Sequence, residues 1–334
     1  MSGKSLAARR VLSLAGAAVI ALSAAACSSS SASDSGSAQV PELRVGASPS
    51  LAGLGLQVAI SQEAACKDNL IVTSTVNRSA YDSMPQLLSG GLQVAQMDTI
   101  TFLQARTQGL PVQIIAANGE QSTDGKPGQQ SAGSIVTTPD SPITSPKDLA
   151  GKKVGVPGIK TQVWMNIRAI VDADGGDSAQ IEFIEVPPAQ MIDLLTQGTI
   201  DAAIPSEPLA SRSIANGVVK FIRNTDVPGN KGVPSSVYVA TGDFVDRNRE
   251  AIDKFVSCVQ LAAEEVNENP DLAAEIARER LGYKPEQLTN AFYQTFGTDA
   301  VIPAEIDKIT ALAVKYGILT EQPDAAGVLA GPSN

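Results

Sequence analysis

The sequence contains no histidine, and aromatic residues make up only 4% of its 334 positions. Without imidazole, a Ser-His-Asp triad, a Cys-His nucleophile and a His-based metal site are all disfavoured, so we expect neither a metal nor another cofactor. With one Trp, five Tyr and seven Phe in the whole chain, a binding cleft lined by several stacking rings is not expected.

Basic residues are scarce relative to acidic ones. The chain has 25 Lys and Arg against 35 Asp and Glu, which gives a formal net charge of −10. Residues 1–26 contain Lys4, Arg9 and Arg10 and no acid, so the rest of the chain has 22 bases, 35 acids and a net charge of −13. A surface this acidic is poorly suited to a phosphate backbone. We therefore expect no nucleic-acid partner.

The first 26 residues have the layout of an export signal. Their basic residues precede an uncharged, mostly apolar run, 11–26, and Cys27 follows it. A membrane anchor is the alternative, but a run of about 16 residues is shorter than the roughly 20 that span a bilayer. The ending Ala-Ala-Ala-Cys resembles a bacterial lipoprotein signal, although Ala24 stands where Leu is usual. That resemblance implies a lipid on Cys27; general export and, from Arg9-Arg10, twin-arginine export both stay open.

Residues 27–40 are rich in serine and have no apolar periodicity, so we expect a flexible tether. With its lipid, this tether would hold a folded domain at the outer face of the bacterial cell membrane. Cys66 and Cys258 would then lie outside the reducing cytosol, where a pair of cysteines favours a disulfide. Two separate buried thiols are the alternative.

A sixteen-residue pattern occurs twice in the chain. MPQLLSGGLQVAQMDT, residues 84–99, aligns without gaps to MIDLLTQGTIDAAIPS, residues 191–206. Each copy reads as the end of an amphipathic helix, a glycine stop, a short buried strand and a polar loop. In an open α/β sheet, the loop after the carboxyl end of a strand is where ligands bind. The repeat therefore predicts two similar lobes with a polar loop at corresponding places.

Strand and helix patterns alternate along both halves of the folded part, which indicates an α/β fold with mainly parallel sheets. The run LIVTSTV, residues 70–76, is continuous and β-branched, as in a strand covered on both faces. We expect lobe one to contain residues 41–136 and 236–334, and lobe two to contain residues 137–235. The extended segments near 134–138 and 235–240 would be the hinge crossings, with a cleft between the lobes.

Several motifs in this order are similar to those of a known family: LRVGASPS, QGLPVQIIA, SPKDLAGKKVGVPG, LLTQGTIDAAIPSEP and VNENPDLAAEIARERLG. They resemble extracytoplasmic substrate-binding proteins of ABC importers, in the branch for nitrate, taurine, other sulfonates and thiamine-type pyrimidines. The resemblance covers nearly the whole mature chain, but GLQV, residues 91–94, departs from the usual acidic pattern, and Asn69 stands where Gly is usual. It implies the type II periplasmic-binding-protein fold and, as partners, a small-molecule ligand, a permease and its ATPase. We expect a monomer.

The resemblance also implies a ligand site between the lobes, built from loops after strands and from helix N-termini. The candidates in lobe one are Ser48, Ser50, Asn77, Arg78, Ser79, Asp98 and Thr99. The candidates in lobe two are Gly158, Ile159, Lys160, Thr161, Gln162, Ser206 and Glu207. Ser134 and Ser235, near the crossings, and Tyr81 could join them, and Glu207 would face Asp98 and Thr99 across the cleft.

Each candidate has a structural alternative. Ser48 and Ser50 could only cap a helix, and Asp98 could be the N-cap of the helix that follows it. Arg78 could be a solvated loop charge, and Glu207 could be an acid in the first turn of a helix. Trp164, the only Trp, is expected in the core rather than against a ligand.

The charged candidates give a partial description of the ligand. Arg78 and the helix N-termini favour an anionic group such as a sulfonate, whereas Asp98 and Glu207 favour an amine or a ring N–H. We therefore expect a small polar ligand that is anionic or zwitterionic. A pyrimidine-binding protein of the same fold and a lipid-tethered sensor without a transport role are the alternatives. We do not expect an enzyme, because histidine is absent and the two cysteines of the folded part fall on helices away from the loops.

Overall fold

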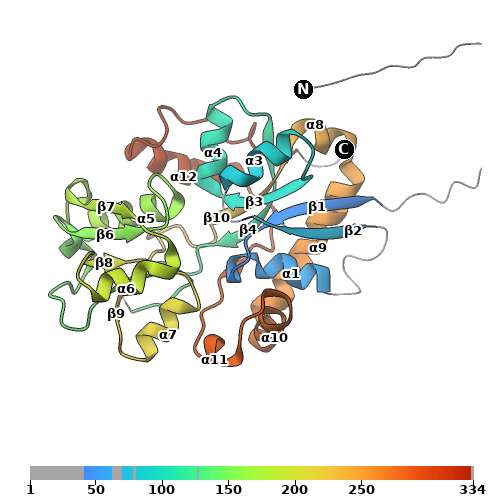
Figure 1. The fold of residues 1–334 in the computed structure, drawn as a ribbon. Coiled ribbons are helices and arrows are strands. Elements are labelled where there is room, and N and C mark those ends of the chain that lie inside the picture. The colour runs from blue at the N-terminus through green and yellow to red at the C-terminus, as the bar shows by residue number, and fades with distance from the viewer. Residues whose placement is uncertain (1–40, 62–69, 78–79, 126–127, 332–334) are drawn as a thin grey trace, which may run out of the picture. The chain divides into compact units, whose positions relative to one another are not determined.

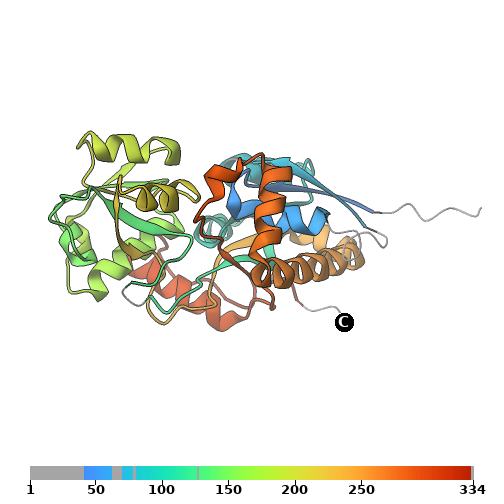
Figure 2. The same cartoon turned by 90° about the horizontal axis from the view of Figure 1, so that it is seen from below.

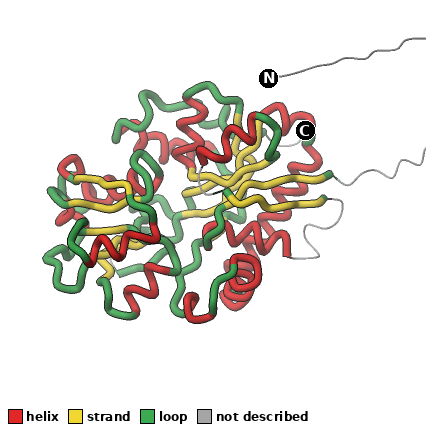
Figure 3. The backbone as a smooth tube through the Cα atoms, in the orientation of Figure 1, coloured by secondary structure: helices red, strands yellow, loops and turns green. Residues whose placement is uncertain are grey.

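The computed structural model describes residues 41–61, 70–77, 80–125 and 128–331, whose strands form two sheets flanked by helices (Figures 1 and 3). The expected α/β class is confirmed. Cys27 lies outside the described residues, as do the export signal and the tether. Within the described residues, no helix is long and apolar enough to cross a membrane.

The first sheet has six strands in the order β11-β4-β10-β3-β1-β2. Their bounds are β1 Glu42–Ala47, β2 Ile71–Val76, β3 Val94–Asp98, β4 Val112–Glu120, β10 Pro234–Thr241 and β11 Thr295–Phe296. β1 is parallel to β2 and β3, whereas β10 is antiparallel to both β3 and β4. Strands β1 to β4 therefore run in one direction, and the sheet is mainly parallel.

The second sheet has five strands in the order β7-β6-β8-β5-β9. Their bounds are β5 Ser134–Thr137, β6 Lys153–Val156, β7 Glu182–Glu185, β8 Ala202–Ala203 and β9 Lys220–Asn224. β6 is parallel to β7 and β8, and β5 is antiparallel to β8 and β9. The order matches β2-β1-β3-β10-β4 strand for strand. The two sheets thus repeat one topology, and β3 and β8, which carry the sequence repeat, occupy equivalent places.

The segments that join the sheets differ from the expected ones. Residues 134–138 and 235–240 were predicted to be the crossings, but they fall largely within β5 and β10. The chain leaves the first sheet after Glu120 and returns to it at Pro234, so residues 121–133 and 225–233 connect the sheets. The prediction failed because strand-forming residues were read as extended linkers. We call these segments the first and second crossing.

The prediction for β2 was also wrong. Its apolar, β-branched run predicted a strand covered on both faces, but β2 lies at the edge of the first sheet. Ile71 and Val76 are 49% and 60% exposed. A continuous β-branched run fits an edge strand as well as a central one, because β propensity describes a pleated surface and not its depth.

Helices that follow their sequence signals cover the sheets. In α9, Arg249–Glu268, apolar residues at helical spacing form a buried face, which includes Ile252, Phe255 and Val259. It packs against α1, Leu54–Ser61, beside α10, Pro270–Leu281, as Figure 2 shows. The remaining labelled helices are α3 Ala80–Leu88, α4 Thr99–Thr107, α5 Gln162–Ala173, α6 Met191–Thr196, α7 Leu209–Ala215, α8 Gly242–Arg247, α11 Pro285–Leu288 and α12 Pro303–Lys315.

The C-terminal helix α12 contacts both halves of the fold. It follows β11 of the first sheet, packs against α4 and α5, and precedes Leu329, which forms a bridge with Ile114 of β4. One apolar core joins residues of α4, α5 and α12, among them Phe102, Ile167 and Ile309. The C-terminal segment therefore adds a third structural link between the two sheets.

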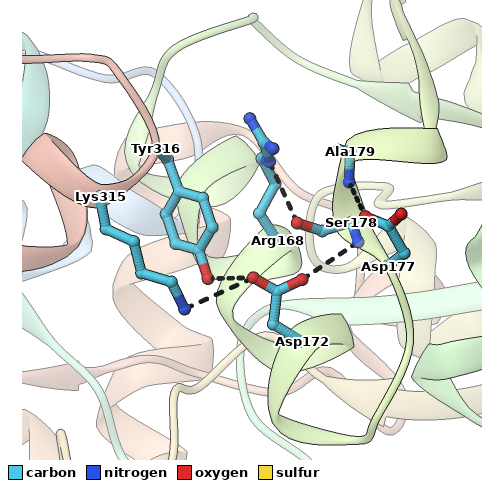
Figure 4. A network of polar contacts seen from close by, with 7 residues as sticks. All are labelled: Arg168, Asp172, Asp177, Ser178, Ala179, Lys315 and Tyr316. Atoms are coloured by element: carbon cyan, nitrogen blue, oxygen red, sulfur yellow. Dashed lines mark hydrogen bonds and ion pairs between the residues drawn. The ribbon is translucent and has the colours of Figure 1, made fainter.

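Polar contacts fix the end of α12 to α5 (Figure 4). The Tyr316 hydroxyl donates to Oδ2 of Asp172 at 2.9 Å, and the Lys315 ammonium lies 3.5 Å from the same oxygen. The guanidinium of Arg168 lies over the rings of Trp164 and Tyr316, 4.9 Å from each centroid. Trp164 is buried in the core, as its sequence position suggested.

Removing the Tyr316 hydroxyl should weaken this link. We expect Tyr316→Phe to lower the free energy of unfolding by about 1–2 kcal/mol in urea titrations, because it removes a hydrogen bond to a carboxylate. Lys315→Gln is the control: its side chain is 56% exposed, and exposed ion pairs contribute less than about 1 kcal/mol. Equal losses in the two variants would contradict a special role for the hydroxyl.

Candidate functional site

A cavity of about 370 Å³ is lined by residues of the first sheet, of α5 beside the second sheet, and of both crossings. The first sheet supplies residues at or just beyond strand ends, and α5 supplies residues of its first turn and a half. The lining used in the argument below is Ser48, Gln96, Asp98, Glu120, Gln121, Gln162, Asn166, Asp226 and Ser236. The site thus lies where the resemblance implied, at the carboxyl ends of β1, β3 and β4.

A second cavity of about 160 Å³ adjoins the first. The two share five lining residues, including Ala52, Gly133 and Gln294. Glu207 and Phe292 line only the smaller one. Phe292 is the only aromatic residue among the described residues that line either cavity.

The predicted residues divide into three groups. The larger cavity is lined by Ser48, Asn77, Asp98, Gln162 and Ser235, and the smaller by Ser50, Ser206 and Glu207. The residues that line neither cavity are Thr99, Ser134, Gly158, Ile159, Lys160 and Thr161. The rest cannot be placed, since Arg78 and Ser79 lie outside the described residues and the Tyr81 side chain is not described.

The turn before α5 shapes the site without lining it. Lys160 is exposed and has a φ of 59°, and the Thr161 hydroxyl donates to the Gly158 carbonyl at 2.8 Å. This turn places Gln162, and not Lys160, at the first helical position beside the cavity. Thr99 is buried and donates to the carbonyl of Pro234 at 2.8 Å, so it supports β10 from within the core.

Asp98 is the N-cap of α4, which was the structural alternative considered for it, and it also lines the larger cavity. As the N-cap of α4, its Oδ1 accepts the Thr101 N–H at 3.0 Å, and its Oδ2 accepts the Thr101 hydroxyl. The same Oδ1 accepts the Gln162 N–H from the other lobe at 3.4 Å. Loss of hydration raises the pKa of the Asp98 carboxyl above its usual value, although these donors oppose the shift. The cap therefore also forms a polar contact across the cleft.

Ser50 likewise caps a helical turn, residues 51–53, and Ser48 contacts this cap. Ser50 accepts the Ala52 N–H at 3.3 Å, and the Ser48 and Ser50 hydroxyls are 2.8 Å apart. The Ala52 carbonyl then accepts three side-chain amides, from Gln96 at 2.8 Å, Asn118 at 3.2 Å and Gln294 at 3.3 Å. The wall of the cavity at Ala52 is therefore held by side chains from three separate parts of the chain.

The repeat predicted that Glu207 would face Asp98 and Thr99, but it does not. The residue that contacts Asp98 across the cleft is Gln162. Oε1 of Glu207 accepts the Ser211 hydroxyl at 2.9 Å, and Oε2 accepts the Phe292 N–H at 3.5 Å. Its peptide bond to Pro208 is cis. Burial raises the pKa of Glu207 to about 7. The acid thus lies just before α7, accepts from Ser211 in its first turn, and also contacts Phe292, which belongs to the C-terminal part of lobe one.

Two further acids line the larger cavity that the sequence reasoning did not single out. Asp226 is buried, which raises its pKa, and it accepts the Thr123 N–H and hydroxyl, each at 2.9 Å. Burial raises the pKa of Glu120 to about 7, and the charges of Glu305 and Asp299 add to the effect. Both acids follow strand ends, which is the signal that could have revealed them. Gln121 and Asn166 gave no comparable signal.

Neither the cysteines nor the acids form a reactive cluster within the described residues. Cys258 is buried in α9 and takes part in a disulfide; its expected partner, Cys66, lies outside the described residues. No group of three or more Cys, Asp or Glu side chains in the described part is arranged to hold a metal ion.

Comparison with known proteins gives one family and one fold. A family model described as NMT1/THI5 like matches residues 67–273. The taurine-binding periplasmic protein of Escherichia coli (strain K12) is 25% identical over 204 residues, which are 60% of this chain and 60% of that protein. The chain thus spans less than two thirds of that relative's length.

Solved structures share the fold over most of this chain. The periplasmic aliphatic sulphonate binding protein SsuA of Escherichia coli superposes with a TM-score of 0.70 at 16% identity, covering 86% of this chain and 97% of that one. The alkanesulfonate-binding protein SsuA of Xanthomonas axonopodis pv. citri, bound to MOPS, gives 0.67 at 15% identity, with coverage of 86% and 98%. At these identities the likeness shows the fold alone.

The raised pKa of Glu207 predicts a pH-dependent stability. A carboxyl that titrates near 7 when folded and at 4.5 when unfolded stabilises the fold fully below 4.5, and this contribution is lost as pH rises through 7. At about 1.4 kcal/mol per pKa unit the loss reaches roughly 3 kcal/mol. We expect Glu207→Gln to flatten the decrease in unfolding free energy over this range.

Glu264→Gln, which changes an exposed glutamate of α9, is the matched control and should keep the wild-type profile. Chemical denaturation at a series of pH values measures both. A Glu207→Gln profile as steep as that of the wild type would show that Glu207 does not titrate in this range.

Proposed function

Because the chain belongs to the NMT1/THI5-like family, we propose that it is the substrate-binding component of an ABC importer. It captures a small polar ligand, anionic or zwitterionic, between its two lobes and delivers it to a membrane permease with an ATPase. The observation that carries the proposal is the cavity of about 370 Å³, to which the first sheet, helix α5 of the second lobe and both crossings contribute polar side chains. A site divided between two lobes suits a protein that closes around its ligand.

The relatives support a sulfonate-like ligand. One is named for taurine, and the structural neighbours are named for aliphatic sulphonates and alkanesulfonates. The cavity favours such a ligand over the alternative pyrimidine, because a flat ring is usually held by stacking and the described lining offers one aromatic side chain, Phe292. These relatives are binding proteins, which supports a role without catalysis.

The N-terminal pattern supports an extracytoplasmic location. The export-signal layout of residues 1–26, the Cys27 that ends it and the Ser-rich tether 27–40 fit a lipoprotein held at the outer face of the bacterial cell membrane. Permease and ligand would then meet on the same side of the membrane. The disulfide of Cys258, for which Cys66 is the proposed partner, suits this oxidising location.

Lobe movement is part of the proposed mechanism. The polar contacts across the cleft, from Gln162 to Asp98 and from Phe292 to Glu207, are 3.4 and 3.5 Å long, near the limit of a hydrogen bond. Their loss on opening therefore has a small energetic cost. Gly229 and Gly232 in the second crossing have φ angles of 81°, so turns rather than regular structure connect the lobes there.

A thermal-shift panel tests the ligand class. We expect at least one compound among taurine, alkanesulfonates, nitrate and amino acids to raise the melting temperature, with about 2.7 kcal/mol of stabilisation at about 100 times its dissociation constant. A pyrimidine is included as the alternative. The proposal would be overturned if only a neutral apolar compound had an effect.

Small-angle scattering tests the movement. With a ligand found in that panel, the radius of gyration should fall on binding, because the lobes close around the ligand. A panel compound without thermal shift is the control and should leave the curve unchanged. An unchanged radius of gyration at a saturating concentration of the true ligand would contradict hinge closure.

A further inference from the structure

Glu207 lies where the two lobes meet around the smaller cavity. Lobe two contributes the segment 204–207 to the lining of this cavity, and Glu207 itself is 7% exposed. Residues of lobe one line the same cavity, so the burial of this carboxyl depends on both lobes. The lining residues from lobe one are Ser50, Leu51, Ala52, Phe292 and Gln294.

Two short helices meet beside Glu207. α7 begins two residues after it, at Leu209, and packs against α11 of lobe one (Figure 1). Phe292 follows the end of α11, and its N–H donates to Oε2 of Glu207. Since the chain connects the lobes at the crossings, an opening that widens the smaller cavity draws α11 and Phe292 away from α7. Such an opening admits water to Glu207.

The hydrogen bonds of Glu207 are divided unequally between the lobes. Ser211, which belongs to the same lobe, donates its hydroxyl to Oε1 at 2.9 Å and its N–H to Oε2 at 3.4 Å. Phe292, from lobe one, donates at 3.5 Å. Opening therefore costs the carboxylate the longest of these three hydrogen bonds and restores its hydration. For an ionised carboxyl, the gain in hydration outweighs a contact of this length.

Burial, and not a neighbouring charge, controls the protonation of Glu207. Burial raises the pKa of this carboxyl to about 7, and the opposing effects come from the hydrogen bonds of Ser211 and Phe292. The ionisable groups on the surrounding elements add no charge effect to the shift. Among the described residues these groups are Lys160, Arg212, Lys284, Glu286 and Tyr293, and, in the adjoining cavity, Asp98, Glu120 and Asp226.

We propose that Glu207 is a proton-dependent switch of lobe closure: protonation of its carboxyl favours the closed form of the ligand-free protein, and ionisation favours the open form. This inference rests on the lobe movement of the proposed function and adds a regulation to it. An ionised carboxylate costs far more to bury than a neutral one, so ionisation favours the form in which water reaches it. A ligand that requires the closed form is consequently held more tightly at acidic pH.

The direction and the pH range follow from the two pKa values. Hydrated in the open form, Glu207 titrates near its ordinary pKa of 4.5, whereas burial raises the pKa to about 7. The ratio of closed to open molecules is therefore highest below pH 4.5, falls as pH rises from 4.5 to about 7, and is constant above that range. The difference between the two pKa values changes this ratio at most about 300-fold.

Small-angle scattering of the ligand-free protein at a series of pH values tests the switch. The radius of gyration of the wild type should increase between about pH 5 and about pH 7 and stay level to about pH 8. Glu207→Gln is neutral at every pH and nearly isosteric, so it should keep the compact value throughout. A wild-type radius that does not change with pH, or an expansion that persists in Glu207→Gln, would overturn the proposal.

Glu120→Gln is the matched control. The pKa of Glu120 is also raised to about 7, but the charges that add to this shift, Glu305 and Asp299, lie with it in lobe one. Glu120→Gln should therefore retain the expansion between about pH 5 and about pH 7. Loss of the expansion in this variant would overturn the assignment to Glu207.

Ser211→Ala gives a readout that a merely structural Glu207 would not move. The Ser211 hydroxyl lowers the pKa of Glu207, so its removal should displace the expansion to higher pH. This variant also covers the case in which Glu207→Gln does not fold, with folding of both checked by circular dichroism. An expansion at the wild-type pH in Ser211→Ala would contradict titration of Glu207.

The switch and the proposed function fail separately. If a compound from the thermal-shift panel compacts the protein while pH does not, the switch is wrong and the proposed function stands. If no panel compound compacts it, hinge closure around a ligand is wrong, whatever the effect of pH.

Discussion

A buried carboxylate joins the two crossings between the sheets. Asp226 lies in the second crossing and accepts hydrogen bonds from Ser122, Thr123 and Ser131 of the first. Because an unpaired buried carboxylate is strongly unfavourable, these donors hold the crossings side by side. The neighbouring Val227 N–H donates to Oε1 of Gln121, so the contact between the crossings also orients the Gln121 amide.

The same two crossings explain the topology. The chain enters each sheet from the other one, and the strand that follows a crossing, β5 or β10, runs against both of its neighbours. All other equivalent strands keep one direction, so the two sheets share one order. The repeat in the sequence therefore reports a repeat in space, with the carboxyl ends of β3 and β8 in matching positions. In such a fold, the protein residues that contact a ligand lie where strands end and the chain turns.

The sequence was informative wherever a signal is local. Apolar periodicity and first-turn prolines mark α9, α10 and α12, and the polar end of the strand in the first repeat indicated Asp98. Contacts between distant residues had no local signal. Gln121 and Val227 are 106 positions apart, and Glu207 and Phe292 are 85 apart. The repeat suggested Glu207 as the partner of Asp98, but α5 begins at Gln162 and places that residue there instead. Hydrophobic patterns report which face is buried and not which polar groups meet.

Backbone groups of the second crossing orient two buried amides of residues that line the cavity. The Thr225 carbonyl and the Val227 N–H lie two residues apart in the second crossing, and each orients one buried amide. The Thr225 carbonyl accepts from Asn166, which in turn accepts from Nε2 of Gln162 and leaves Oε1 of Gln162 as an acceptor. The Val227 N–H donates to Oε1 of Gln121 and leaves Nε2 of Gln121 as a donor. A backbone donor or acceptor cannot reverse its role, so neither glutamine can flip its amide without losing a buried hydrogen bond. The second crossing thus fixes the orientation of both amides, and a hinge movement that displaced it would alter their hydrogen bonds together.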